Sequence, residues 1–188
     1  MVKDWEAGIV KKIITEEQLK ARIEELGEQI TNDYKDDDAE FIVVGILKGS
    51  ILFMADLIRK IKLPLKIDFM EVSSYGDNFE TTKDVKIIKD LDYSVRGKNV
   101  LIVEDIIDSG LTLKKVLQLI GKRGPKNVIL CTLLDKVTKR EVDIDIQYTG
   151  FEIPNEFVLG YGLDFIQEYR NIPYIGVMDL EKYEKEKK

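Results

Sequence analysis

The sequence has no histidine and a single cysteine, Cys131, among its 188 residues. The absence of histidine excludes Ser-His-Asp triads, Cys-His pairs and zinc, iron or copper sites that depend on histidine ligands. The single cysteine excludes an intrachain disulfide, and its place in an apolar run favours a buried structural residue. Acid–base chemistry must therefore come from Asp, Glu, Lys or Tyr. A metal would be a hard cation held by oxygen, with Mg²⁺ as the default.

Long apolar stretches are also lacking. The longest, FIVVGIL at residues 41–47, falls well short of the roughly 18 residues that span a bilayer. The sequence begins MVKDWEAG, with acidic residues where a signal peptide would have its apolar core. We therefore expect a cytoplasmic protein with no membrane partner. The formal net charge of −6 argues against nucleic acid as a partner, but it is compatible with a small anionic substrate that meets a local positive patch.

Apolar strands alternate with amphipathic helices along the chain. The pattern predicts helices over 16–31, 51–61 and 111–122, and strands over 41–46, 65–72, 85–90, 99–104 and 127–134. Thr15 and Gln18 form a capping-box pattern, and Ser50 is the expected N-cap of the second helix. Repeated strand–turn–helix–strand units predict a single α/β domain with a mostly parallel central sheet flanked by helices. Ligands of such sheets bind beyond the carboxyl ends of the strands.

The segment VLIVEDIIDSGLTL, residues 100–113, is the most informative in the chain. Its apolar strand ends in Glu104 and Asp105, and a third acid, Asp108, precedes a Ser-Gly turn into a helix. Backbone N–H groups at a helix start suit a phosphate, although the Walker A pattern is absent. Three carboxylates would repel a bare phosphate unless sugar hydroxyls or Mg²⁺ lay between them, which favours a sugar phosphate with a diol. On local sequence alone, the segment is equally consistent with a capped helix beside solvated acids.

The same segment resembles the phosphoribosyl-diphosphate (PRPP) motif of type I phosphoribosyltransferases, and most closely that of the hypoxanthine-guanine phosphoribosyltransferase family. Further motifs agree in order and spacing over residues 13–178: LKGS at 47–50, SSYG at 73–76, LLDK at 133–136, GFEIPNEFVLGYGLD at 150–164, and Arg170. The one departure lies in the loop, where Asp77, Asn78, Phe79 and Lys83 stand at positions that often carry small residues in the family.

The resemblance implies the type I phosphoribosyltransferase fold in one domain over 1–188. A small hood would come from about 1–14 and 145–188, and residues 73–84 would form a mobile loop. It implies a pentosyltransferase of purine salvage that transfers 5-phosphoribosyl from PRPP to hypoxanthine, with guanine as a second base. The products would be IMP or GMP and diphosphate. Mg²⁺ would be the cofactor, and the protein would form a homodimer or homotetramer.

Site residues carry over from the family's motifs one by one. The residues expected to bind PRPP and its phosphates are Lys48, Gly49, Glu104, Asp105, Asp108, Ser109, Gly110, Leu111, Thr112 and Arg170. Those expected around the purine are Ile106, Lys136, Phe157, Val158 and Asp164. The expected metal ligands are Glu104, Asp105 and Asp164. The expected lid residues are Ser74 and Tyr75. By the same resemblance, the peptide bond before Lys48 is expected to be cis.

The catalytic roles fall to Asp108 and Lys136. Asp108 would be the general base or acid at N7 of the purine, and we expect Glu104 and Asp105 to raise its pKa. Lys136 would donate to the 6-oxo group and so disfavour adenine, which presents an amino donor there.

Purely structural interpretations of the same residues, and other functions, stay open at this point. Lys48, Gly49 and Ser50 would form an ordinary turn, Phe157 would be a core residue and Lys136 a solvated one. Asp164 would cap a helix, and Arg170 would pair with a surface acid such as Glu168. The alternative functions are a xanthine-preferring phosphoribosyltransferase, a PRPP-sensing regulator, and a phosphoacceptor signalling domain.

Overall fold

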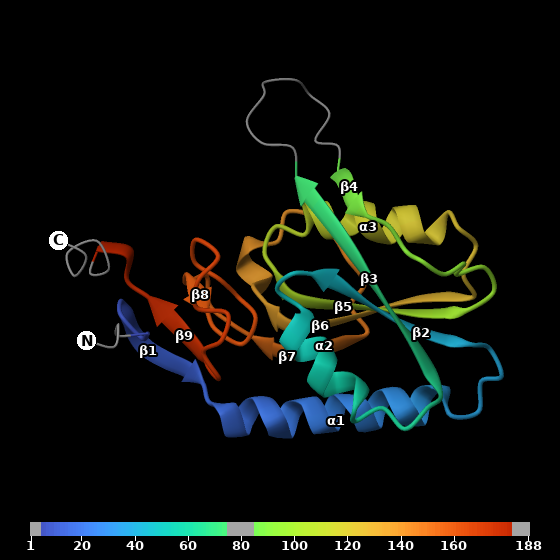
Figure 1. The fold of residues 1–188 in the computed structure, drawn as a ribbon, viewed down its shortest axis with the longest axis horizontal. Coiled ribbons are helices and arrows are strands. Elements are labelled where there is room, and N and C mark those ends of the chain that lie inside the picture. The colour runs from blue at the N-terminus through green and yellow to red at the C-terminus, as the bar shows by residue number, and fades with distance from the viewer. Residues whose placement is uncertain (1–4, 75–84, 182–188) are drawn as a thin grey trace.

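The computed structural model describes residues 5–74 and 85–181 and contains two β-sheets (Figure 1). The six-stranded sheet has the order β4-β3-β2-β5-β6-β7. Its strands are β2 (Phe41–Leu47), β3 (Leu65–Ser74), β4 (Val85–Lys89), β5 (Asn99–Ile107), β6 (Asn127–Asp135) and β7 (Tyr148–Glu152). All neighbouring pairs are parallel except β3 and β4. The mostly parallel central sheet expected from the sequence is thus confirmed.

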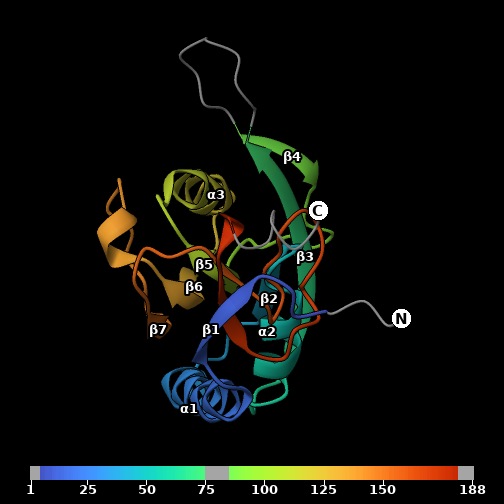
Figure 2. The same cartoon turned by 90° about the vertical axis from the view of Figure 1, so that its left-hand side faces the viewer.

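Three helices cover the two faces of this sheet. α1 (Glu16–Tyr34) and α2 (Ile51–Ile58) lie on one face, and α3 (Leu111–Gly121) lies on the other (Figure 2). Neighbouring residues of β2 point to opposite faces: Val43 packs with the α1 and α2 cluster, whereas Val44 packs with α3. Burial on both faces explains why the central strands are continuous apolar runs. A short 3₁₀ turn, η1 (Val137–Lys139), follows β6.

The two predicted N-terminal caps, at α1 and at α2, compare differently with the structure. At α1, the N–H of Gln18 donates to Thr15 Oγ1 at 3.3 Å and the N–H of Thr15 donates to Gln18 Oε1 at 2.8 Å, which confirms the capping box. Ser50 does stand at the predicted N-cap position of α2, but its side chain makes no capping hydrogen bond there. Ser50 has helical backbone angles, and its fully buried hydroxyl donates instead to the carbonyl of Ile46 at 2.6 Å. The buried Ser50 hydroxyl therefore satisfies its hydrogen bond with a β2 carbonyl and not with an N–H group at the start of α2.

A small antiparallel sheet combines both ends of the described chain. It has the order β1-β9-β8, with β1 (Ile9–Ile14), β8 (Val158–Leu159) and β9 (Ile175–Met178). Figure 1 shows it at the end of the molecule toward which the β2 arrow points. β7 pairs with β6, so the expected hood segment 145–188 includes a strand of the main sheet. Within the described ranges, no helix combines the length and apolarity needed to cross a bilayer.

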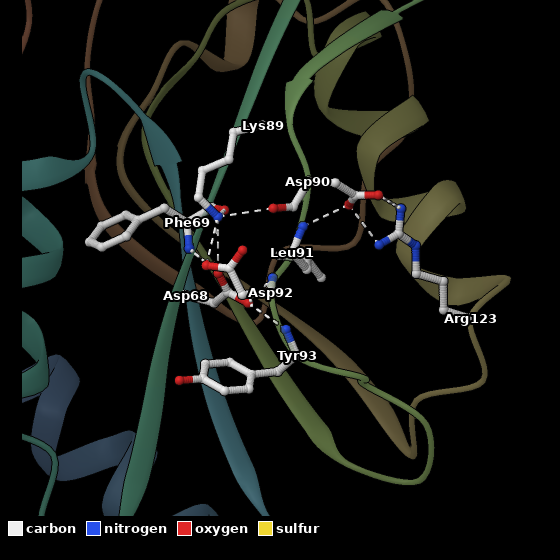
Figure 3. A network of polar contacts seen from close by, with 8 residues as sticks. All are labelled: Asp68, Phe69, Lys89, Asp90, Leu91, Asp92, Tyr93 and Arg123. Atoms are coloured by element: carbon white, nitrogen blue, oxygen red, sulfur yellow. Dashed lines mark hydrogen bonds and ion pairs between the residues drawn. The ribbon is translucent and has the colours of Figure 1, made fainter.

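A polar network fastens β3, β4 and the end of α3 together (Figure 3). The Asp68 carboxylate is almost fully buried and accepts hydrogen bonds from the N–H groups of Asp92 and Tyr93 at 2.8 and 3.1 Å. The Lys89 ammonium lies 3.4 Å from Asp68 Oδ1. On the other side, both carboxylate oxygens of Asp90 accept from the Arg123 guanidinium at 2.7 and 2.9 Å, which lowers the pKa of Asp90. The network therefore holds the turn after β4 against the sheet.

Replacing Asp68 by alanine is expected to lower the free energy of unfolding by about 3 kcal/mol, because the change leaves three backbone donors, those of Phe69, Asp92 and Tyr93, and the Lys89 ammonium without their buried acceptor. Urea unfolding followed by circular dichroism measures this. The matched control is Asp92→Ala, which removes an exposed carboxylate paired with the same lysine at 3.1 Å. The control should cost less than about 1 kcal/mol, as exposed pairs do. Equal losses in the two variants would contradict the role given to Asp68.

Candidate functional site

The loop between β5 and α3 has the features of an anion site. Gly110 stands at the N-cap of α3 with φ 79°, as the expected tight turn requires, and has no side chain with which to cap the helix. Ser109 Oγ lies 3.5 Å from the N–H of Leu111, at the limit of a hydrogen bond. The first-turn N–H groups of the eleven-residue helix α3, Thr112 among them, are thus placed to face a ligand. The N–H of Glu141 donates to the Ser109 carbonyl at 3.0 Å and links this loop to the segment that follows η1.

Glu104 and Asp105 form a buried acidic pair near the end of β5. Burial, and then the neighbouring charge of Asp105, raises the pKa of Glu104 well above its ordinary value. Its Oε2 atom is buried and has no hydrogen-bond partner among the described residues. Burial likewise raises the pKa of Asp105 to about 6, although the N–H of Ile106 donates to its Oδ1 at 2.8 Å. Two carboxylates with so few donors call for hydroxyl groups or a cation.

The turn after β2 lies directly against this acidic pair. The Leu47–Lys48 peptide bond is cis, as expected, and Lys48 is exposed. A Cβ atom at Gly49 would lie 1.5 Å from Asp105 Oδ2, and a Cβ at Gly162 would lie 2.0 Å from the Gly49 carbonyl oxygen. Gly49 is therefore enclosed between Asp105 and the Gly160–Gly162 turn, and the described structure brings these three segments into contact.

Asp164 and Arg170 join the same group. The Arg170 guanidinium lies 2.7 Å from Asp164 Oδ1 and also donates to the Gly162 carbonyl at 2.7 Å. Both act on Asp105, whose pKa is lowered by the charge of Arg170 and raised by that of Asp164. In the described structure no helix begins at Asp164, whose carboxylate instead accepts from the N–H of Gln167 at 2.9 Å in a turn. Arg170 thus forms the ion pair with an acid that its structural interpretation expects, but its partner is Asp164 rather than Glu168, and Asp164 does not cap a helix.

Asp108 faces two lysines from the turn after β6. Its Oδ1 lies 3.0 Å from Lys136 Nζ and its Oδ2 lies 2.8 Å from Lys139 Nζ. Burial raises the pKa of Asp108, but the hydrogen bonds and charges of Lys139 and Lys136 outweigh this and hold it below its ordinary value. The expectation that Glu104 and Asp105 raise the pKa of Asp108 is therefore wrong. The lysines decide it, and Lys139 was not predicted from the sequence.

The residues expected around the purine differ in exposure. Lys136 is 5 % exposed, so it is not a solvated lysine, and Phe157 is 42 % exposed, so it is not a core residue. The Phe157 ring meets Phe165 edge to face, with 5.7 Å between ring centroids. Val158 is buried in β8, and Ile106 packs against the core from β5. Phe157 thus presents an open aromatic face beside the small sheet.

The structure tests the predicted metal ligands and lid residues only in part. Within residues 5–74 and 85–181, no group of three or more carboxylates or thiols is arranged to hold a metal by itself. Glu104, Asp105 and Asp164 could therefore hold Mg²⁺ only together with ligand oxygens, which is how Mg²⁺ is usually bound at phosphate sites. Ser74 is the last residue of β3, and Tyr75 lies outside the described residues, as does the rest of the expected loop to residue 84.

Comparison with known proteins adds the family. A profile of the phosphoribosyl transferase domain matches residues 10–166. The chain is 57% identical over 171 residues to a hypoxanthine phosphoribosyltransferase of Salmonella typhimurium, covering 91% of this chain and 96% of the relative. It is 49% identical over 176 residues to a hypoxanthine-guanine phosphoribosyltransferase of Bacillus subtilis, covering 94% and 97%. A crystal structure of a Staphylococcus aureus hypoxanthine phosphoribosyltransferase superposes with a TM-score of 0.90 at 46% identity, covering 97% and 98% of the two chains.

Proposed function

The chain belongs to the phosphoribosyltransferase family as a hypoxanthine(-guanine) phosphoribosyltransferase of purine salvage, and we propose that its active site is the carboxylate and lysine cluster beyond β5. Membership in this family excludes the phosphoacceptor signalling domain. The fold is the type I phosphoribosyltransferase fold, a mostly parallel α/β sheet with a small antiparallel sheet.

The observation that carries the proposed site is the pairing of Lys136 and Asp108. The ammonium and the carboxylate oxygen lie 3.0 Å apart and present a donor beside an acceptor. A 6-oxopurine with a proton on N7 presents the complementary pair, an oxo acceptor beside an N–H donor on one edge of the ring. Adenine presents an amino donor where the oxo group stands. Binding a 6-oxopurine would exchange the lysine–carboxylate contact for two contacts to the base, whereas adenine would leave the buried ammonium facing a donor.

We assign the phosphate groups of PRPP to the two loops. The loop 108–112 would hold the 5′-phosphate with backbone N–H groups at the start of α3. Lys48, Gly49 and Arg170 would hold the diphosphate. The diphosphate gains negative charge as it leaves, so positive groups bind it more strongly in the transition state than in the ground state. The exposed face of Phe157 would stack on the purine, and Val158 would contact it through the backbone. Ser74 and Tyr75 stay proposed lid residues that would exclude water.

The acidic pair suits the ribose diol and Mg²⁺. Ribose hydroxyls would donate to Glu104 and Asp105, which supplies a partner for the buried Glu104 Oε2 atom. Glu104, Asp105 and Asp164 would hold Mg²⁺ together with oxygens of the bound PRPP. Bound there, the cation would neutralise charge on the diphosphate. Its field would also lower the pKa values of both buried carboxylates.

Activity assays with four bases, hypoxanthine, guanine, adenine and xanthine, measure the substrate range. With PRPP and Mg²⁺, the enzyme should convert hypoxanthine and guanine to nucleotides and release diphosphate. Adenine should give at least about a hundredfold lower kcat/KM, the usual penalty for a mismatched buried polar group. Xanthine tests the xanthine-preferring alternative. The control reaction contains EDTA in excess of Mg²⁺ and should be inactive. Turnover of adenine at the hypoxanthine rate would contradict the assignment of Lys136, and turnover of none of the bases would favour the PRPP-sensing regulator.

Assembly and location stay parts of this proposal. We propose a homodimer or homotetramer with no nucleic-acid or membrane partner, located in the cytoplasm. Support for self-association comes from apolar side chains left exposed on α2 and on β3. They are Ile51, Leu52 and Ile67.

A further inference from the structure

Asp108 receives its two cations from one short segment of the chain. Lys136 and Lys139 both lie in the turn that follows β6, with Lys136 before η1 and Lys139 at its end. They contact different oxygens of the same carboxylate, Oδ1 at 3.0 Å and Oδ2 at 2.8 Å. The Lys139 N–H donates to the Lys136 carbonyl at 2.9 Å, which holds the two residues in one turn. The carboxylate is therefore fixed on both sides.

The three cations of this turn differ in their other partners and in their exposure to solvent. Arg140 pairs with the buried carboxylate of Asp135 and is not available to Asp108. The Lys136 side chain is 7% exposed and is the proposed donor to the 6-oxo group. The Lys139 side chain is 43% exposed and contacts Asp108 from the solvent side. If a purine took the place between Lys136 and Asp108 Oδ1, the Lys139 contact with Oδ2 would be left as it is.

We propose that Lys139 is a positioning residue for the transfer reaction: it holds Asp108 by Oδ2, so that Oδ1 stays directed at N7 of the bound purine. This rests on the proposed role of Asp108 as the base. In the transfer step, N9 of the purine forms its bond to C1′ of the ribose as the bond from C1′ to diphosphate breaks. The proton on N7 passes to Asp108 Oδ1. Lys139 takes no part in bond making and acts through the carboxylate that it orients.

Lys139 also determines the charge of that carboxylate during the reaction. Among the described residues, the charged groups that act most strongly on Asp108 are Lys139 and Lys136, and burial opposes them. Once Lys136 has turned to the base, Lys139 is the group that keeps Asp108 ionised and ready to accept a proton. Without it, burial would raise the pKa of Asp108, and the ionised fraction would fall at the acid side of the pH range.

A competing role for Lys139 is direct contact with the 5′-phosphate, because Asp108 begins the phosphate loop. The two roles differ in measurable ways. A phosphate contact would change the KM for PRPP whatever residue stands at position 108. A positioning role would change the rate of nucleotide formation at saturating PRPP, and only while Asp108 is present.

The experiment is a double-mutant cycle on the full-length enzyme with PRPP, Mg²⁺ and hypoxanthine. Single-turnover rates are measured from about pH 5 to 9 for wild type, Lys139→Met, Lys139→Arg, Asp108→Asn and the Lys139→Met/Asp108→Asn pair. Lys139→Met should lower the rate roughly tenfold, with the loss growing toward acid pH, and Lys139→Arg should recover most of it. Adding Lys139→Met to Asp108→Asn should change the rate less than about twofold. Lys122→Met, the same change of charge at the far end of α3, is the control and should match wild type.

Three results would overturn the proposal. They are an equal loss from Lys139→Met in both backgrounds, a raised KM for PRPP with an unchanged saturated rate, and an arginine variant no better than methionine. Failure of the underlying function would look different. In that case wild type would not convert hypoxanthine, or Asp108→Asn would be fully active, and the base assignment itself would fall.

Discussion

Replacing Asp108 by asparagine is expected to lower kcat for nucleotide formation by about 10² or more, with little change in the KM for PRPP or hypoxanthine. Asparagine keeps the size of the side chain and one oxygen that can accept from Lys136, so the site should keep its shape. It has no carboxylate to take the N7 proton, which must then pass to water or stay in place. Steady-state kinetics at saturating PRPP and Mg²⁺ measures the effect.

The matched control is Asp143→Asn, which removes the charge of an exposed carboxylate in the segment that follows the Arg140 turn. It should leave kcat within about twofold, as surface changes away from a site usually do. A kcat within a few-fold of wild type in the Asp108 variant would remove this residue from the chemistry. A raised KM with an unchanged kcat would make it a binding residue only.

The state of Asp108 shows where sequence reasoning stops. Its position after a strand and before a helix follows from the local pattern, and that place is correct. Its pKa depends on Lys136 and Lys139, which arrive from the turn after the next strand. The acids close to it in sequence have less influence than these lysines. The only sequence signal for Lys139 is the run DKVTKR at 135–140, which is indistinguishable from a solvated charged turn.

The fold could be predicted further than the site. Strands buried on both faces must be apolar throughout, so β2, β5 and β6 are visible as runs, and the parallel sheet follows from their alternation with helices. β7 is less visible, because its sequence YTGFE is short and mixed and its place beside β6 depends on tertiary pairing. The Ser50 cap failed for a related reason. A local preference was overridden by a buried carbonyl partner in β2.

Gly162 combines two constraints that make any side chain costly there. Its φ of 105° lies in the region that residues with a Cβ rarely adopt. An added Cβ would lie 2.0 Å from the Gly49 carbonyl oxygen, a backbone atom that cannot swing aside as a side chain would. The carbonyl of Gly162 also accepts from Arg170 at 2.7 Å. Any shift here therefore moves both the Lys48–Gly49 turn and the Arg170 guanidinium, the two groups assigned to the diphosphate.

Gly162→Ala is accordingly expected to raise the KM for PRPP at least tenfold and to lower the free energy of unfolding by about 2–3 kcal/mol. The KM for hypoxanthine should change less, because Lys136 and Asp108 contact other segments. Steady-state kinetics in both substrates and urea unfolding measure the two effects. Gly121→Ala is the control, since a Cβ at this last residue of α3 would meet no atom within 4 Å and should leave both quantities unchanged or slightly improved. If Gly162→Ala lost stability but kept its KM for PRPP, the contact between the two turns would serve the fold alone. The diphosphate would then have to be held by groups that do not depend on how Gly49 and Arg170 are placed.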